Sequence, residues 1–306
     1  MPRVILALLL SLQTSVVCSQ DLEAFECTPQ WLSLVEQSIP STPEVTPFRA
    51  RNLLVFSLHT GFEHWAIPHV DAVIGLLARK TGAASVTYSQ DIRDFETARL
   101  RAFDAVVLNN TCPERDHRNI FYDVFRKDSL MEDAARWEQA AVLEENLLAY
   151  VRNGGGIVLL HGGTTMQLNS ESFSEMAGGS FDFHPPQQPM RVRIVEPGHP
   201  ITKGFQNQEF TLTDEPYFFK NAYPKKDFRP LLAMDARELK GLEQPVEDPL
   251  RYIAWIKPYG KGRVFVSAPS HNAHQLEDPE FLGFLLNGIQ YALGDLPADD
   301  GKPQGN

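Results

Sequence analysis

Cysteine is scarce in this chain. Three cysteines occur among 306 residues, far fewer than a disulfide-stapled fold requires, so a hydrophobic core has to stabilise the protein. The length allows one large domain or two small ones. Cys27 and Cys112 either form a bridge in an oxidising compartment or stay free, and the sequence leaves both alternatives open.

The chain also lacks an excess of positive charge. Lysine and arginine total 28 against 39 aspartates and glutamates, which gives a net charge of −11, and no long basic run interrupts this balance. A nucleic-acid partner requires a basic face, so we expect no nucleic-acid binding. An acidic surface is an equally poor match for anionic lipid.

Long apolar runs are absent after residue 19. The run from Val4 to Leu12 follows a positive charge and precedes small residues around Ser19, which is the pattern of a secretory signal peptide. It is shorter than the roughly 20 residues that span a bilayer. Cys18 would suit a lipoprotein anchor, but Val17 before it is bulky for that processing. We therefore predict a signal peptide over residues 1–19 and a secreted, extracellular or periplasmic protein that is not membrane-bound after cleavage.

Several catalytic signatures are missing. The sequence has no H-E-x-x-H, no paired C-x-x-C and no G-x-S-x-G serine elbow. The glycines at 154–156 precede a predicted strand and do not open a helix, so they form no phosphate-binding loop. We expect no nucleotide cofactor.

Apolar strands and amphipathic helices alternate along the first half. The apolar runs predict strands over 53–58, 85–88, 103–108 and 157–160, and the helical periodicity predicts helices over 64–80 and 131–152. This alternation is typical of an α/β fold with a parallel sheet and helices on both faces. The second half is less regular, with strands predicted over 190–196 and 210–213, a hairpin of 252–257 with 264–267, and a last helix over 279–293.

The chain is predicted to form a single domain with two flanking segments. Residues 20–50 are predicted to be an N-terminal arm, because Pro40, Pro43 and Pro47 exclude a strand interior. The domain covers residues 51–295. Residues 296–306 are predicted to be a disordered polar tail.

Candidate functional residues gather at the predicted carboxyl ends of the strands, where open parallel sheets form their sites. These residues are His59 and His64 after the first strand, Asn109 after the third, His161 after the fourth and His271 after the hairpin. His161 stands before two glycines at a sharp strand end, where a nucleophile elbow would expose its side chain. A neutral histidine there suits metal ligation or proton transfer, and the alternative is a buried imidazole bonded to the backbone.

Adjacent carboxylates form a second candidate. Asp214 and Glu215 end a predicted strand, where they could act as acid and base, or one could bind a metal; the alternative is a solvated turn. His184 and His199 lie in loops bounded by proline, where histidines are more often structural. Asn109 begins a formal glycosylation sequon, but the end of a buried strand is a poor acceptor site.

Seven motifs in order resemble the trehalose-utilisation, ThuA-like family. They are Gly61-Phe62-Glu63-His64, Phe103-Asp104-Ala105-Val106-Val107, Gly154 to His161, Phe181-Asp182-Phe183-His184-Pro185, Gly198-His199-Pro200-Ile201, Asp214-Glu215-Pro216-Tyr217 and Gly260 to Phe265. The resemblance runs from about Leu53 to Leu293. It implies the class I glutamine amidotransferase-like fold, a flavodoxin-like three-layer α/β sandwich with a mostly parallel sheet.

The resemblance also implies a site, with departures in this chain. True amidotransferases of this fold carry cysteine at the elbow, so His161 there excludes thiol-based glutamine hydrolysis. Ser270 replaces the glycine of the family's Gly-His element, and Glu63 stands where the family often has arginine. What carries over is a sugar-sized polar site with a divalent-metal or histidine–carboxylate centre. The family name is no guide to the substrate.

Two hypotheses follow from this reading. The first is an enzyme acting on a sugar or keto-sugar, as a hydrolase, lyase or isomerase, with one zinc, manganese or iron ion as the candidate cofactor. The second is a non-catalytic carbohydrate-binding or interaction protein on the same fold. The predicted catalytic residues are His161, Asp214, Glu215 and His271, the predicted metal ligands are His64, His161 and His271, and the predicted substrate-binding residues are Trp65, Asn109, His184 and Tyr217. An oligomer is compatible with the sequence, but no segment specifies an interface.

Overall fold

The computed structural model describes residues 22–244 and 246–303. The predicted signal peptide, residues 1–19, lies outside the described residues. Within the described ranges, none of the helices combines the length and apolar character needed to cross a membrane.

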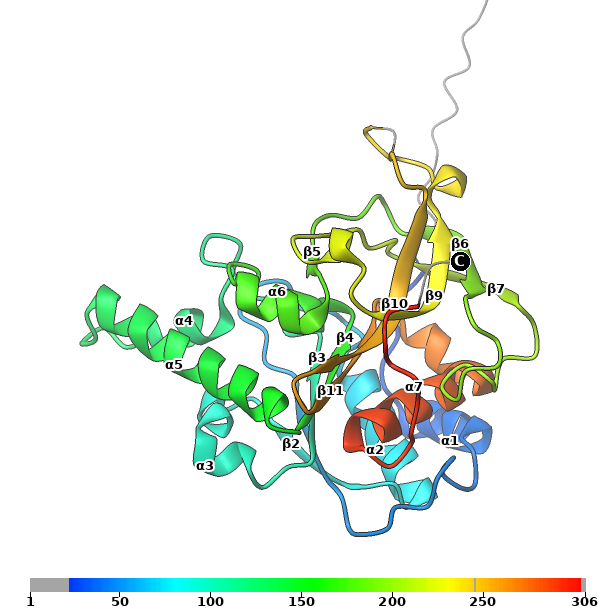
Figure 1. The fold of residues 1–306 in the computed structure, drawn as a ribbon, viewed down its shortest axis with the longest axis horizontal. Coiled ribbons are helices and arrows are strands. Elements are labelled where there is room, and N and C mark those ends of the chain that lie inside the picture. Colours follow the sequence, from blue (N-terminus) through cyan, green and yellow to red (C-terminus); the bar gives the residue numbers. More distant parts are fainter. Residues whose placement is uncertain (1–21, 245, 304–306) are drawn as a thin grey trace, which may run out of the picture.

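A nine-stranded sheet forms the centre of the molecule (Figure 1). In spatial order its strands are β2 (Ser85–Ser89), β1 (Asn52–Phe56), β3 (Ala105–Asn109), β4 (Gly156–Leu160), β11 (Gly262–Ser267), β10 (Leu250–Tyr259), β9 (Arg229–Asp235), β6 (Gln188–Ile194) and β7 (Glu209–Asp214). The first five pair in parallel, and the remaining pairs are antiparallel. A separate antiparallel pair joins β5 (Ser180–Phe181) to β8 (Phe219–Lys220).

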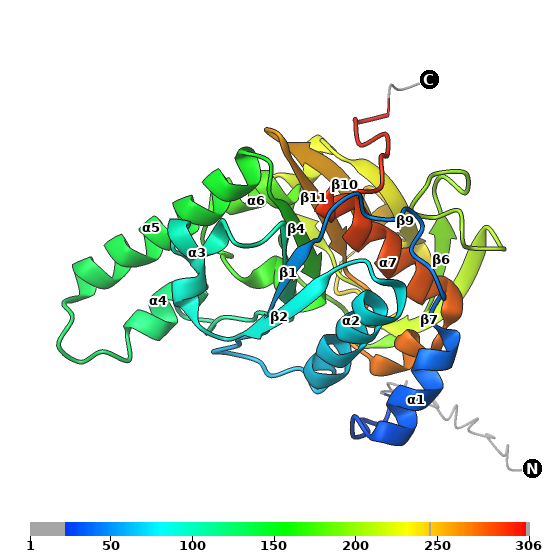
Figure 2. The same ribbon diagram turned by 90° about the horizontal axis from the view of Figure 1, so that it is seen from below.

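Helices cover both faces of the parallel half. Helices α2 (Ile67–Thr81) and α7 (Pro279–Leu293) lie together on one face, and α5 (Asp133–Arg152) packs on the other (Figure 2). The short helices α3 (Thr97–Leu100), α4 (Ile120–Phe125) and α6 (Glu171–Ala177) contact α5. Five 3₁₀ turns complete the described part: η1 (Ile92–Phe95), η2 (His161–Thr165), η3 (Tyr223–Lys225), η4 (Ala236–Glu238) and η5 (Ala273–Glu277).

Local sequence explains these elements. Strands β3 and β4 are buried along their whole length, as continuous apolar runs require between two helical layers. Helix α2 ends at Gly82, whose φ of 71° is a conformation that glycine adopts readily, and α7 begins at Asp278, whose carboxylate caps the first turn. The prediction of a mostly parallel α/β sandwich is confirmed, and the order 2-1-3-4 is that of the flavodoxin-like fold.

The predicted N-terminal arm contains a helix that the sequence analysis did not identify. Helix α1 (Pro29–Ser38) begins at Thr28, whose hydroxyl accepts a hydrogen bond from the Trp31 amide, and it packs on α2. Trp31, Val35 and Ile39 join the hydrophobic core. The prolines that follow this short helix exclude strand structure but do not prevent docking of the arm.

Strand β9 was also missed, and the predicted tail differs from the structure. Residues 296–303 lie along the domain: Leu296 is buried, and the Asp300 carboxylate accepts a hydrogen bond from the Tyr291 hydroxyl at 2.7 Å. Asp295, just before the tail, is buried in an ion pair with Arg51. The Tyr291–Asp300 contact attaches this segment to helix α7, and the Asp295–Arg51 pair attaches the residue before it to the start of strand β1.

Candidate functional site

The connections after β1, β3, β4 and β11 meet at the carboxyl edge of the parallel strands. The chain passes from β1 to β2 on one side and then to β3 on the other, so the edge contains a topological switch point, where such sheets bind ligands. A cavity of about 560 Å³ opens there. Its lining includes residues from all but the last of these connections, together with the segment after β7.

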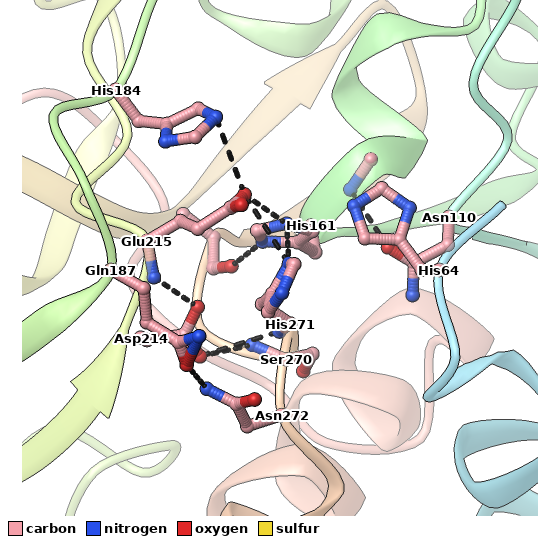
Figure 3. Close-up of polar contacts among 12 residues, drawn as sticks. His64, Asn110, His161, His184, Gln187, Asp214, Glu215, Ser270, His271 and Asn272 are labelled. Atoms are coloured by element: carbon pink, nitrogen blue, oxygen red, sulfur yellow. Dashed lines mark hydrogen bonds and ion pairs between the residues drawn. The ribbon is translucent and has the colours of Figure 1, made fainter. Parts of the chain in front are cut away.

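His161 occupies the sharp turn after β4. Its φ of 46° lies in the left-handed region that side chains other than glycine rarely adopt. The ring is fully buried, and its Nδ1–H donates to the Ala268 carbonyl at 2.7 Å. In the neutral ring this bond leaves a lone pair on Nε2, the atom that faces the other site residues (Figure 3).

Glu215 brings three histidines together. Its Oε2 lies 3.2 Å from His161 Nε2, 3.3 Å from His271 Nδ1 and 3.6 Å from His184 Nε2. Burial works to raise the pKa of this carboxyl. In their protonated forms His161 and His271 donate hydrogen bonds to Glu215, and these bonds together with the positive charges outweigh burial and hold the pKa of Glu215 well below its usual range.

His64 completes the cluster from the loop after β1. Its ring packs edge-on against His161 and His271, with centroids 4.9 and 5.2 Å apart. Burial, reinforced by the two neighbouring imidazoles, lowers the pKa of His64 to about 2. The imidazole is therefore neutral at physiological pH and keeps a lone pair available for a ligand.

Asp214 has a different place from its neighbour. Its carboxylate is fully buried beneath the cluster and accepts hydrogen bonds from the backbone amides of Ser270 and His271 at 3.1 and 3.3 Å, and from the amide of Glu215 at 2.7 Å. Burial raises the pKa of Asp214. The prediction that Asp214 acts directly as a catalytic acid or base does not fit this position, because its oxygens are committed to backbone amides. It positions the segments that carry Glu215 and His271.

The two glycines after His161 allow the cluster to pack closely. A Cβ on Gly162 would lie 2.6 Å from Cys112 Sγ and 3.1 Å from His64 Cε1. A Cβ on Gly163 would lie 2.2 Å from the Leu108 carbonyl oxygen. All three distances are shorter than a normal contact, so the close approach of β3, the segment after it and the loop after β1 requires glycine at positions 162 and 163.

The cluster has the donor set of a metal site. His64, His161, Glu215 and His271 each offer one ligand atom, and these atoms lie within 4.8 Å of one another. The three closest, from His161, Glu215 and His271, are 3.2 to 3.3 Å apart. Ligand atoms about 2.0 to 2.1 Å from a tetrahedral zinc lie about 3.3 to 3.4 Å from one another. The Nδ1–H of His161 already donates to the Ala268 carbonyl, so it cannot face His271 or Glu215. The lone pairs of His161 Nε2, His271 Nδ1 and Glu215 Oε2 would repel one another at these distances unless protons or a cation lay between them. The residues fit a divalent ion.

Other residues line the cavity above the cluster. Tyr217 packs against the His161 ring with centroids 4.1 Å apart, and His184 is partly exposed beside it. Sequence reasoning placed both in the substrate site but missed Phe62, Arg115 and Arg118, which also line it. Phe62 belongs to the motif Gly61-Phe62-Glu63-His64 given above. The two arginines follow the carboxyl end of β3, so the expectation that sites form at the carboxyl ends of parallel strands could have identified them.

Two predicted substrate-binding residues lie elsewhere. Trp65 is not among the cavity-lining residues; its ring packs against Phe25 and His69, with centroids 5.2 and 5.1 Å apart. Asn109 is fully buried and donates from Nδ2 to Ile67 O and to Asp71 Oδ1, which ties β3 to α2. This burial also keeps its sequon out of reach of a glycan. His59, after β1, is outside the cluster and lies near Glu63.

The two cysteines within the described residues, Cys27 and Cys112, are free. Cys27 Sγ lies 3.8 Å from the Pro68 carbonyl, whereas Cys112 Sγ lies 3.8 Å from His64 Nδ1. Burial raises the pKa of Cys112 to about 11, so its sulfur is a thiol and not a nucleophilic thiolate.

The fold and site together define a flavodoxin-like α/β protein with histidine at the elbow and a buried histidine–carboxylate cluster at the switch point. The chain belongs to the trehalose-utilisation (ThuA) family, whose sequence model matches residues 52–292. The resemblance inferred from the seven motifs is thereby confirmed. No curated protein matches the chain.

Solved structures support the same fold. A putative ThuA-like protein from Bacteroides uniformis is 17% identical with a TM-score of 0.58, over 82% of this chain and 91% of that protein. One from Parabacteroides merdae is 16% identical with a TM-score of 0.56, over 81% and 92%. A cytoplasmic protein from Salmonella typhimurium is 14% identical with a TM-score of 0.50, over 79% and 98%. At these identities the similarity establishes the fold alone.

Proposed function

We propose that this protein is an enzyme that acts on a sugar or keto-sugar through the histidine–carboxylate cluster, with a divalent metal ion as cofactor. The observation that carries the proposal is the convergence of His64, His161, Glu215 and His271 from four separate segments, beside a cavity that His64 and Glu215 line. Burying several imidazoles and a carboxylate together costs desolvation free energy, and clusters of this kind mark functional sites.

The residues have distinct tasks in this proposal. His161 is oriented by the Ala268 carbonyl, and Asp214 holds the backbone beneath His271. Glu215, ionised at neutral pH, supplies the negative charge that would balance a bound cation. His184, partly exposed and 3.6 Å from Glu215, is placed to accept a proton from a sugar hydroxyl or from a carbon beside a carbonyl and to pass it to solvent. A divalent ion held by His64, His161, Glu215 and His271 would polarise a carbonyl or lower the pKa of a bound water.

The alternative is a carbohydrate-binding protein without catalysis. Phe62 favours it, because this aromatic ring lines the cavity and is 60% exposed, as a sugar-stacking ring would be. Stacking alone, however, requires neither the buried carboxylate nor the histidines below it.

The test is turnover of a panel of glycosides and keto-sugars by the wild type, Glu215→Gln and His161→Asn. Asparagine tolerates the left-handed backbone of position 161, so that variant should fold. We expect turnover in both variants to be roughly 10² or more below that of the wild type, because each variant loses one group of the centre. His59→Gln, at a partly exposed histidine outside the cluster, is the matched control and should keep full activity. Sugar binding without turnover in the wild type would favour the binding protein.

We also propose that the substrate is met outside the cytoplasm, because residues 1–19 have the pattern of a cleaved leader. N-terminal sequencing of protein recovered from its producing cells should find Gln20 first. An intact Met1 would contradict this.

A further inference from the structure

The cavity above the cluster is lined by charged side chains, and not all of them have a partner of opposite charge. Its lining includes three cations, Arg115, Arg118 and Lys220, and three carboxylates, Glu114, Asp182 and Glu215. Every one of these carboxylates already has a cationic or histidine partner. Glu114 accepts from Arg126 at 2.8 Å, Asp182 pairs with Lys220 at 2.9 Å, and Glu215 lies among the histidines.

Arg115 and Arg118 are the two cations of the cavity lining whose charge is not paired within the described residues. Within residues 22–244 and 246–303, neither guanidinium has an ion pair or a side-chain hydrogen bond, and both residues are exposed. The chain as a whole carries a net charge of −11, so a generally basic surface does not explain two unpaired arginines in the lining of one cavity. A guanidinium offers a planar fork of donors that matches carboxylate, sulfate and phosphate oxygens.

The loop that carries the two arginines is fixed. Arg118 has a φ of 56°, a conformation that favours glycine, and both of its backbone groups are bonded: its amide donates to Glu114 O and its carbonyl accepts from the Asn169 amide. At the start of the loop the Cys112 carbonyl accepts from the amides of Thr60 and Gly61. A charged side chain held at a strained backbone position beside a cavity indicates that this position is used.

We propose that Arg115 and Arg118 bind an anionic group on the substrate, so that the natural substrate is a sugar that carries a carboxylate, sulfate or phosphate. This inference rests on the proposed function, because it concerns the same cavity. The anionic group lies at the rim, and the neutral part of the sugar faces Tyr217 and the cluster below.

The test compares D-glucuronate with D-glucose, which differ only at carbon 6, by calorimetric titration of the wild type. We expect glucuronate to bind at least about tenfold more tightly, the size of one charge-assisted hydrogen bond, and this preference to fall as salt is raised. Arg115→Gln and Arg118→Gln should each lose most of it while binding glucose unchanged. Arg79→Gln, at an exposed arginine on α2, is the control and should keep it. D-glucose 6-sulfate and D-glucose 6-phosphate identify which oxyanion is preferred.

A further variant separates recognition from a structural role. Arg118→Gly suits the left-handed backbone, so we expect it to raise the Tm and still lose the preference for glucuronate. A lowered Tm with the preference intact would assign Arg118 to loop structure and overturn the proposal. Equal affinity of the wild type for glucose and glucuronate would also overturn it, while leaving a neutral-sugar enzyme in place.

A separate experiment tests the two arginines in case the proposed function itself is wrong. If the wild type binds no sugar at all, a sulfate titration followed by thermal melting tests the arginine pair alone. A rise in Tm for the wild type and Arg79→Gln that is absent from the double variant R115Q/R118Q would support an anion site. The same rise in all three proteins would overturn it.

Discussion

Two residues of the site, His161 and Ser270, hold backbone conformations that favour glycine, with φ of 46° and 150°. Such conformations cost about 1 to 3 kcal/mol each and persist where the surrounding structure requires them. At His161 the requirement is clear, because the turn after β4 aims Nε2 at Glu215 and His271. At Ser270 the side chain supplies no compensating contact: within the described ranges its buried Oγ has no hydrogen-bond partner.

Replacing Ser270 with glycine should therefore stabilise the protein. The amide of residue 270, which donates to Asp214, is retained, and the strained conformation becomes an allowed one. We expect Ser270→Gly to raise the free energy of unfolding by about 1 kcal/mol, or the Tm by about 2 to 4 °C.

Thermal melting measures this change, and Ser267→Gly is the matched control. Ser267 lies in strand β11, and its Oγ donates to the Pro269 carbonyl, so glycine there should lower the Tm. A fall in Tm for Ser270→Gly would instead assign a stabilising role to its hydroxyl.

At the scale of elements, the N-terminal arm docks through an aromatic cluster. Phe25 and Trp31 lie against His69 of α2, with ring centroids 4.9 Å away in each case, and Trp31 Nε1 donates to Glu277 Oε1 at 2.8 Å. His274 packs on the other side of Phe25, at 4.9 Å. His69 is only 1% exposed. The docked arm therefore buries the titratable imidazole of His69 among aromatic rings.

This burial makes the docking of the arm sensitive to pH. Burial lowers the pKa of His69 below 6.5 in the folded protein, so between that lowered value and about pH 6.5 the unfolded chain binds a proton that the folded protein does not. Stability should therefore fall as the pH drops below about 6.5, by up to about 1.4 kcal/mol per pH unit from this group.

Denaturant unfolding of the wild type and His69→Phe, measured from about pH 6.5 down to about pH 5, tests the assignment. The variant keeps an aromatic ring in the cluster and should show a shallower loss of stability. His59→Gln, at a partly exposed histidine, should follow the wild type. Parallel curves for the wild type and His69→Phe would show that other groups cause the pH dependence.

Most elements of the parallel half could be predicted because strands β1, β3 and β4 are largely apolar runs and helix α2 has a clear apolar periodicity. The elbow histidine was found because its strand end is marked by two glycines, which the packing of Cys112 and Leu108 requires. Helix α1 was missed because the three prolines that follow it led us to interpret the whole of residues 20–50 as an irregular arm.

Side-chain direction limited the prediction of the site. Trp65 and Asn109 lie at strand ends as expected, yet the turn geometry points them at the arm and at α2. Asp214 and Glu215 are adjacent, so sequence alone could not show that one is buried beneath the cluster and the other lies within it. Their roles depend on β7 and on the loop after β11, which are distant in sequence.

At the scale of the whole molecule, the sheet combines a parallel half that places His64, His161 and His271 with an antiparallel extension, β10-β9-β6-β7, that delivers Glu215. The cluster exists only when both halves are assembled. The site offers no thiolate nucleophile among the described residues, because the elbow carries His161 in place of a cysteine and the Cys112 thiol is protonated.

The most direct test of this account is elemental analysis of the purified mature protein beside His161→Asn and the control His59→Gln. We expect about one equivalent of zinc, manganese or iron in the wild type and the control, and loss of the metal in His161→Asn. Circular dichroism should show that all three proteins are folded. Absence of metal from the wild type, even after reconstitution with each of the three ions, would contradict a metal centre and leave the cluster with proton transfer alone.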